Sequence, residues 1–261
     1  MSQVESQAVS YELIKTPTAH NVAALWMQNP PVNALSKSVR VGLIEHLNTA
    51  IADDSVELIV ISSKQSLFSG GADISEFSGG DLEPNLPAVL DVIENSPKPV
   101  VAVLNGPAFG GGLEVALSCH YRVTFASNKV GLPEVNLGIL PGAGGTQRLP
   151  RVVGPAKALD MMLTGARVGA EEALSIGLIT RLSASADTHL TEVSELAAAV
   201  AARPPLATAY VRRAARTALD VELTKGLDLE LDLFALLKNS EDAKEAAEAF
   251  KEKRSPQFTG R

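Results

Sequence analysis

Two glycine clusters and two glutamates are the residues of this chain whose types and spacing could support catalysis. The triplet Gly110–Gly112 stands two residues before Glu114, which lies in the apolar run LEVAL. Glycine has no Cβ, so a ligand can approach its backbone closely, and the first N–H groups of a helix have no acceptor within the helix. If a helix begins at the triplet, unpaired N–H donors would therefore lie beside a carboxylate.

A second glycine cluster and a second glutamate extend this pattern. Gly70 lies in the segment FSGGAD, and Glu134 follows Pro133 in GLPEVNLG. Two backbone donors that converge on one oxygen form an oxyanion hole. Two carboxyl groups in unlike environments can serve as acid and base. Together these residues indicate proton abstraction or water addition beside a carbonyl group.

Each feature also has an ordinary structural explanation. A glycine triplet commonly serves a tight turn, a lone glutamate in an apolar helix is commonly paired or exposed, and GLPEVNLG alone is typical of a loop. Other motifs fail in detail: GPAFGGGLE lacks the Lys-Ser/Thr of a phosphate-binding loop, and GAGGTQ has two of the three dinucleotide-binding glycines without a preceding strand pattern. The sequence has neither GxSxG nor HExxH. The four histidines are scattered and are interpreted as structural or exposed: His20, His46, His120 and His189.

The glycine clusters follow segments that have the pattern of buried strands. Apolar runs predict strands, and amphipathic or buried segments between them predict helices. The strands are expected at 21–28, 57–63, 99–106 and 121–127, and the helices at 37–53, 87–97 and 113–120. Alternating strands and helices predict an α/β fold. Ligands usually bind at the carboxyl ends of such strands, which is where both glycine clusters fall.

The second part of the chain has a different character. From about Gly154 the sequence is mostly helical in pattern, and SEDAKEAAEAFKEKR has a serine at the N-cap, early acids and late bases. We therefore expect residues 1–194 to form a core with the active site and residues 195–261 to form a helical region. Such helices can bury their apolar faces against the core or against a neighbouring subunit.

Composition argues against several classes of protein. Of the 261 residues, 46% are hydrophobic and 20% are charged, which is typical of a chain with a substantial core. The net charge of −7 argues against a nucleic-acid partner. One cysteine, Cys119, excludes an intrachain disulfide and a cysteine-cluster metal site, so no metal is predicted.

The sequence also carries an expectation about location. No basic, apolar leader begins the chain, and no apolar run is long enough to cross a membrane. We therefore expect no membrane partner and a cytoplasmic protein, most simply bacterial, or a mature mitochondrial or peroxisomal chain without its presequence.

Several segments together resemble a known family. SLFSGGADISEF, KPVVAVLNGPAFGGGLEVALSCHYRV, VGLPEVNLGILPGAGGTQRLPRVVG and ALSIGLI resemble the crotonase superfamily of enoyl-CoA hydratases and isomerases. The resemblance runs from about Val22 to Phe258. NPPVNALS and the segment that begins GLPEVNLG are most similar to the hydratase/isomerase segment of multifunctional β-oxidation enzymes.

The resemblance implies a fold and a ligand. The fold is a crotonase-like α/β spiral of repeated ββα units, followed by a C-terminal helical region that makes trimers, often paired into hexamers. The partner is an acyl-CoA thioester. Because CoA is part of the substrate, no separate cofactor is expected.

The resemblance also assigns roles to matching residues. Glu114 and Glu134 match the two catalytic acids, and Gly70 and Gly111 match the oxyanion-hole donors. The matching substrate-binding positions are Gly70, Gly71, Ala72, Asp73, Ile74, Gly111, Lys253 and Phe258. Two positions depart from the commonest hydratases: Gly70 stands where alanine is frequent, and Ser75 stands where lysine is common.

Both glutamates favour a hydratase that adds water syn across a 2-enoyl-CoA to give a 3-hydroxyacyl-CoA. The alternatives are a Δ3,Δ2-enoyl-CoA isomerase, an enzyme with both activities, and a non-catalytic acyl-CoA-binding protein. The sequence leaves acyl chain length open. It predicts that chain length depends on the segment 78–95, in which Gly79, Gly80 and Pro84 indicate a mobile loop over the acyl pocket.

Overall fold

The structure is a computed structural model that describes residues 8–16, 20–79, 82–185 and 188–261. It divides into two compact units, Met1–Glu195 and Leu196–Arg261. Within the described residues, no helix is both long and apolar enough to span a membrane.

The first unit is built on a six-stranded sheet. Its strands lie in the order β1-β2-β3-β4-β6-β9. Their bounds are β1 (Val9–Lys15), β2 (Asn21–Met27), β3 (Leu58–Ser63), β4 (Val100–Val103), β6 (Tyr121–Phe125) and β9 (Arg181–Ser183). Strand β1 pairs antiparallel with β2, and every other neighbouring pair in this sheet is parallel. All six residues of β3 are buried, because a parallel strand is covered on both faces.

A second, smaller sheet stands beside the point where the chain leaves β4. It contains β5 (Ala108–Phe109), β7 (Lys129–Gly131) and β8 (Arg167–Gly169), with β7 in the middle. Strands β5 and β7 are parallel, and β7 and β8 are antiparallel. These two- and three-residue strands bring distant loops together near the start of the helix that carries Glu114.

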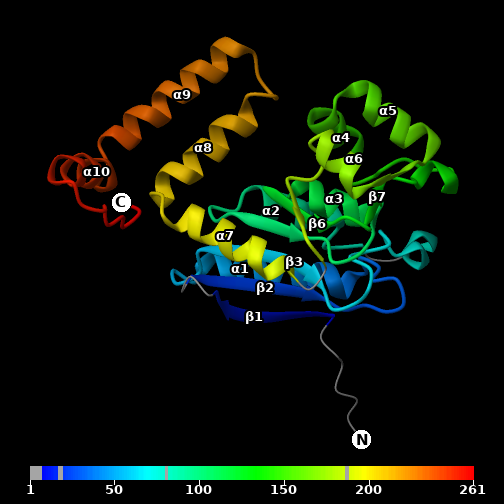
Figure 1. The fold of residues 1–261 in the computed structure, drawn as a ribbon. Helices are drawn as coiled ribbons and strands as arrows, with labels where there is room; N and C mark the ends of the chain where they lie inside the picture. The colour runs from blue at the N-terminus through cyan, green and yellow to red at the C-terminus, as the bar shows by residue number, and fades with distance from the viewer. Residues whose placement is uncertain (1–7, 17–19, 80–81, 186–187) are drawn as a thin grey trace, which may run out of the picture. The chain divides into compact units, whose positions relative to one another are not determined.

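Helices connect and cover the strands of the first unit. Helix α1 packs against β1 and β2, and α2 packs between α1 and α3 (Figure 1). The helices and 3₁₀ turns are α1 (Lys37–Ala52), η1 (Ile74–Ser78), α2 (Leu86–Glu94), α3 (Gly111–Ser118), η2 (Glu134–Leu137), α4 (Gly145–Val153), α5 (Pro155–Thr164), α6 (Ala170–Ser175) and α7 (His189–Ala201). The predicted α/β class and the predicted strands at 21–28, 57–63, 99–106 and 121–127 are confirmed, apart from shifts at their ends.

The second unit begins at Leu196, within α7, and contains three further helices. They are α8 (Pro205–Thr217), α9 (Leu223–Lys238) and α10 (Glu241–Glu252). The predicted cap of α10 is confirmed, since the Ser240 hydroxyl accepts a hydrogen bond from the Ala243 N–H. The helical pattern expected for this part of the chain is therefore correct.

Candidate functional site

The two glycine clusters meet at the start of α3. Ser69 forms an isolated parallel bridge with Ala108, and the Phe109 N–H donates to the Ser69 carbonyl at 2.9 Å. A Cβ on Gly112 would lie 2.7 Å from that carbonyl oxygen, so a larger residue would push the two segments apart. Gly110 precedes α3 with φ of +53°, a backbone conformation that favours glycine.

One predicted oxyanion donor is corrected by the backbone geometry. The Gly70 N–H donates to the Val32 carbonyl at 2.8 Å, so it is not available to a ligand. The Ala72 N–H has no acceptor in the described part of the chain, and its nitrogen would lie 3.3 Å from a Cβ built on Gly111. Gly111 is the first residue of α3, where N–H groups lack an intrahelical acceptor. The candidate donor pair is therefore Ala72 with Gly111.

Glu114 lies on the first turn of α3 and is only 2% exposed. Its Oε1 accepts hydrogen bonds from the N–H groups of Ala143 at 2.8 Å and Gly145 at 2.7 Å. Burial holds the pKa of this carboxyl group above its ordinary value, because it outweighs the two N–H bonds and the positive charge of Arg148, which act in the opposite direction. The two N–H donors hold one carboxylate oxygen and support the ionised form.

Glu134 begins the short turn η2, directly after Pro133, and has a different environment. Its Oε2 is buried without a hydrogen-bond partner among the described residues. Its Oε1 would lie 3.1 Å from a Cβ built on Gly110, so the carboxyl group lies against the glycine triplet. Burial, and secondarily the charge of Glu114, raise the pKa of Glu134 to about 7. Near neutral pH, Glu134 therefore holds a proton more readily than an ordinary glutamate.

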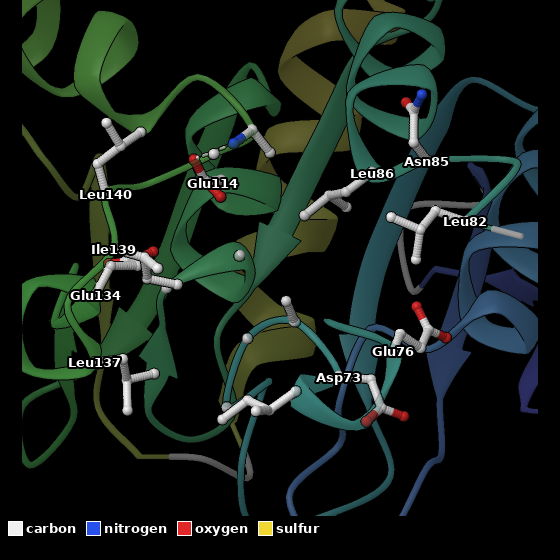
Figure 2. Close-up of a pocket in the computed structure, with 18 of the residues that line it drawn as sticks. Asp73, Glu76, Leu82, Asn85, Leu86, Glu114, Glu134, Leu137, Ile139 and Leu140 are labelled. Atoms are coloured by element: carbon white, nitrogen blue, oxygen red, sulfur yellow. Dashed lines mark hydrogen bonds between the residues drawn. The ribbon is translucent and has the colours of Figure 1, made fainter. Parts of the chain in front are cut away.

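Both carboxyl groups face one cavity of about 330 Å³. Figure 2 shows Glu114 and Glu134 on one side of it, with Leu82 and Leu86 across from them. Of the predicted substrate-binding residues, six line the cavity: Gly70, Gly71, Ala72, Asp73, Ile74 and Gly111. The walls beyond the carboxyl groups are mainly aliphatic, which suits an apolar ligand.

Among the predicted substrate-binding residues, Asp73 has a structural role that the sequence did not indicate, and the roles of Lys253 and Phe258 are untested. Asp73 caps η1, since its Oδ1 accepts from the N–H and the hydroxyl of Ser75. Ser75, where lysine is common in the family, thus serves the local turn. Lys253 and Phe258 belong to the second unit, and their contact with CoA stays a prediction.

Sequence reasoning missed three polar side chains, of which Arg40 lines the cavity, whereas Arg148 and Glu94 do not. Arg40 is almost fully buried and donates to the carbonyls of Leu82 and Pro84, on the predicted loop. Arg148 pairs with Glu94 behind Glu114. No local motif marks these residues, because their partners lie far away along the chain.

The single cysteine and the possible metal ligands show no sign of a second reactive site in the described residues. Cys119 is buried, and burial raises the pKa of its thiol to about 12. Among the described residues, no three His, Cys, Asp or Glu side chains are arranged to hold a metal ion.

Known proteins share both the sequence and the fold. Residues 17–261 match the enoyl-CoA hydratase/isomerase family model. A probable enoyl-CoA hydratase of Bacillus subtilis is 41% identical over 247 residues, which cover 92% of this chain and 95% of that protein. The crystal structure of enoyl-CoA hydratase subunit I from Geobacillus kaustophilus superposes with a TM-score of 0.88 at 36% identity, covering 98% of this chain and all of that one.

A longer relative matches one part of its own length. The peroxisomal bifunctional enzyme of Danio rerio is 48% identical over 173 residues, which are 66% of this chain and 24% of that enzyme. The chain thus spans about a quarter of such bifunctional enzymes. With the family match over nearly all of its length and a relative of similar size, the chain belongs to the enoyl-CoA hydratase/isomerase family.

Proposed function

We propose that this protein is an enoyl-CoA hydratase that adds water across the double bond of a 2-enoyl-CoA, in fatty-acid β-oxidation or related acyl-CoA catabolism. The observation that carries the proposal is a pair of unlike carboxyl groups in one cavity, beside two backbone N–H groups that have no acceptor among the described residues. The name of the Bacillus subtilis relative and the chemistry of the family support the same activity.

The two carboxyl groups suit the two proton transfers of hydration. Ionised Glu114 takes a proton from water as the water oxygen forms a bond to Cβ of the substrate. Protonated Glu134 gives its proton to Cα. Glu114 then passes the proton that it took from water to Glu134, which restores both groups, and the product has gained one hydroxyl group and one hydrogen. Both groups border the same cavity, which supports addition of the hydroxyl and the proton to one face of the double bond.

The backbone donors stabilise the charge that develops between these steps. As the water oxygen bonds to Cβ, electrons shift onto the thioester oxygen and give it enolate character. The N–H groups of Ala72 and Gly111 would donate to that oxygen. Removing one such donor typically costs about 2.7–4 kcal/mol of transition-state stabilisation.

The cavity supports a neutral, apolar acyl group as the preferred substrate. Among its described lining residues Arg40 is the one cation, and its guanidinium already donates to Glu76 and to three carbonyl oxygens. Four acidic side chains also line the cavity: Asp73, Glu76, Glu114 and Glu134. A substrate with a terminal carboxylate on its acyl chain would find repulsion there and no free cation.

The test follows the absorbance of the conjugated thioester with crotonyl-CoA, and in parallel with a 3-enoyl-CoA. Loss of absorbance with crotonyl-CoA is the expected result. Turnover of the 3-enoyl-CoA alone would make the protein an isomerase. A pair of longer 2-enoyl-CoA substrates of equal length, one neutral and one with a terminal carboxylate, tests the acyl preference. We expect kcat/KM to be at least about tenfold lower for the carboxylate.

The second unit supports a proposal about assembly. We propose that residues 195–261 join subunits into a homotrimer or a dimer of trimers. Large apolar side chains of this unit are exposed in the single chain, among them Leu223, Leu227, Leu231, Phe234 and Phe250. Four of these residues recur at intervals of three or four positions along α9, which places them on one side of that helix, and exposed apolar surface of this kind marks protein contacts. A cytoplasmic location is part of the same proposal, and the single cysteine is compatible with a reducing compartment.

A further inference from the structure

Arg148 forms an extended set of hydrogen bonds behind the catalytic base. From helix α4, its Nε donates to Glu94 Oε1 at 2.7 Å and its Nη2 donates to Glu94 Oε2 at 2.9 Å. The two side chains are 24% and 16% exposed, respectively, so solvent screens this bidentate pair only in part. The third donor, Nη1, reaches the Ala143 carbonyl at 2.7 Å.

The Ala143 carbonyl belongs to the turn that holds Glu114. The N–H groups of Ala143 and Gly145 both donate to Glu114 Oε1. Gly144 lies between them with φ of +97°, and the guanidinium of Arg148 occupies the space that a Cβ on Gly144 would need. The Arg148 backbone N–H also donates to the Gly144 carbonyl at 2.8 Å. Arg148 therefore fixes this turn through both its side chain and its backbone.

Arg148 also acts on Glu114 through charge. Among the charged groups that act on the Glu114 carboxyl, Arg148 on α4 is positive, and Glu134 on η2 is negative. Glu94 lies beyond Arg148, at the end of α2. The other end of α2 carries Leu86, which lines the acyl cavity. Helix α2 thus connects a residue of the acyl pocket, Leu86, with the residue that pairs with Arg148, Glu94.

We propose that Arg148 and Glu94 are positioning residues for hydration: they orient the turn 143–145 and keep Glu114 ionised and aimed into the cavity. This inference rests on the proposed function, in which Glu114 is the base. The competing explanation is a salt bridge that only joins α2 to α4 and contributes stability without affecting the chemistry.

The test compares Arg148→Met, Arg148→Lys and Glu94→Gln with the wild-type enzyme, using crotonyl-CoA over a range of pH. In Arg148→Met we expect kcat to fall by about 10- to 100-fold with a smaller change in KM, since a misplaced catalytic group loses rate rather than binding. The acidic limb of the kcat/KM profile should rise by about one pH unit, because the ionised base has lost its nearby cation. Arg148→Lys keeps the charge, so its acidic limb should stay near that of the wild type while kcat falls.

A matched control separates positioning from stability. Lys157 and Glu172 form a salt bridge at 2.6 Å between α5 and α6, away from the cavity lining. Lys157→Met should lower the melting temperature and leave both limbs of the profile unchanged. If Arg148→Met behaves like this control when assayed below its melting temperature, the proposal is overturned.

Two further measurements keep the proposal testable in other circumstances. If Arg148→Met does not fold, the decision rests on Glu94→Gln and Arg148→Lys, and wild-type kcat in both would overturn the proposal. An infrared titration follows the protonated carboxyl band that disappears in Glu114→Gln and needs no turnover. It should show a higher Glu114 pKa in Arg148→Met than in the wild type. The wild-type protein could be inactive while the Glu114 pKa is still higher in Arg148→Met than in the wild type. That result would refute the hydratase assignment, and it would confirm that Arg148 acts on Glu114.

Discussion

Glu114 and Glu134 carry the same functional group, and their neighbours make them chemically unlike. One oxygen of Glu114 accepts two backbone N–H bonds, while one buried oxygen of Glu134 has no partner in the described part of the chain. Hydrogen bonds to a carboxylate favour its ionised form, whereas burial without a partner favours the protonated form. The proposed assignment of Glu114 as base and Glu134 as acid thus rests on these local differences in hydrogen bonding and burial.

Removal of either carboxyl group should show this division directly. We expect Glu114→Gln and Glu134→Gln each to lower hydration of crotonyl-CoA by at least about 100-fold, the usual scale of general acid–base catalysis. Loss of hydration in Glu114→Gln with retained double-bond migration would assign the isomerase step to Glu134. Near-normal hydration by both variants would exclude the mechanism.

The pKa of Glu134 predicts how activity depends on pH. Because Glu134 must be protonated to act as the acid, kcat/KM should fall as the pH rises through about 7. A profile measured with crotonyl-CoA between pH 5 and pH 9 tests this expectation (the bounds are about two units either side of the pKa). A kcat/KM that stays constant over the upper half of this range would contradict it.

The same shift predicts a change in stability. The ordinary glutamate pKa is 4.5, and folding raises that of Glu134 to about 7, so the folded state binds more protons between these values. Stability of the wild type is then lost as the pH rises through this window, and it levels off above it. Glu134→Gln does not lose stability in this way. The difference in melting temperature, variant minus wild type, should therefore increase between pH 4.5 and pH 7 and remain constant at higher pH. A difference that does not vary with pH would argue against the shift.

The correction from Gly70 to Ala72 can be tested atom by atom. Replacing the amide N–H at Ala72 by an ester oxygen should reduce kcat by about 10²- to 10³-fold, because one oxyanion donor is lost. The same replacement at Gly70 removes the bond to Val32 and should lower stability with a much smaller effect on kcat. The opposite order of effects would restore Gly70 as the donor.

At the scale of elements, α3 and the loop after β3 depend on each other. A Cβ on Gly112 would overlap the backbone of Ser69, three residues before Ala72. Gly112→Ala should therefore displace the loop that carries one donor, lowering stability by about 1–3 kcal/mol and kcat by at least about tenfold. Gly169→Ala is a suitable control, since a Cβ there has open space. Denaturant unfolding and steady-state kinetics of the two variants provide the comparison.

Arg40 anchors the part of the segment 78–95 that precedes α2. Its guanidinium donates to the carbonyls of Leu82 and Pro84 and pairs with Glu76. We expect Arg40→Met to raise KM for long neutral acyl chains more than for crotonyl-CoA, because Leu82 at the acyl pocket loses its support. Equal effects on all chain lengths would argue against this role. The mobility of this loop stays a prediction, and Gly80 lies outside the described residues.

Local sequence pattern predicted the helices and strands that have an apolar run or a capping residue. It failed for features that depend on contacts between residues far apart in the sequence. Strand β3 and helix α3 follow from their apolar runs. Strand β1 was missed because its residues are mostly half-buried or exposed, and the two- and three-residue strands β5, β7 and β8 are too short for a periodic signal. The Gly70 error has the same origin: its acceptor, Val32, lies on a separate segment. The Arg148–Glu94 pair spans 54 positions, so no spacing rule could reveal it.

At the scale of the whole molecule, the exposed apolar residues of α9 bear on assembly. Leu231 and Phe234 are 66% and 63% exposed. The double variant Leu231→Asp, Phe234→Asp should form smaller particles than the wild type in light scattering, since charge disfavours an apolar contact. Glu230→Ala, on the same helix, is the control. Wild-type protein that is monomeric at micromolar concentration would refute the proposed trimer.

The buried position of Cys119 has a practical consequence for enzymology. It is the chain's single cysteine. The residue is only 3% exposed, and burial raises the pKa of its thiol to about 12, so thiol-specific dyes should not label the folded protein. Free CoA released by any thioester hydrolysis would then be the sole source of colour in such an assay. Slow side reactions could thus be counted even at high enzyme concentration, and the appearance of a protein signal would report unfolding.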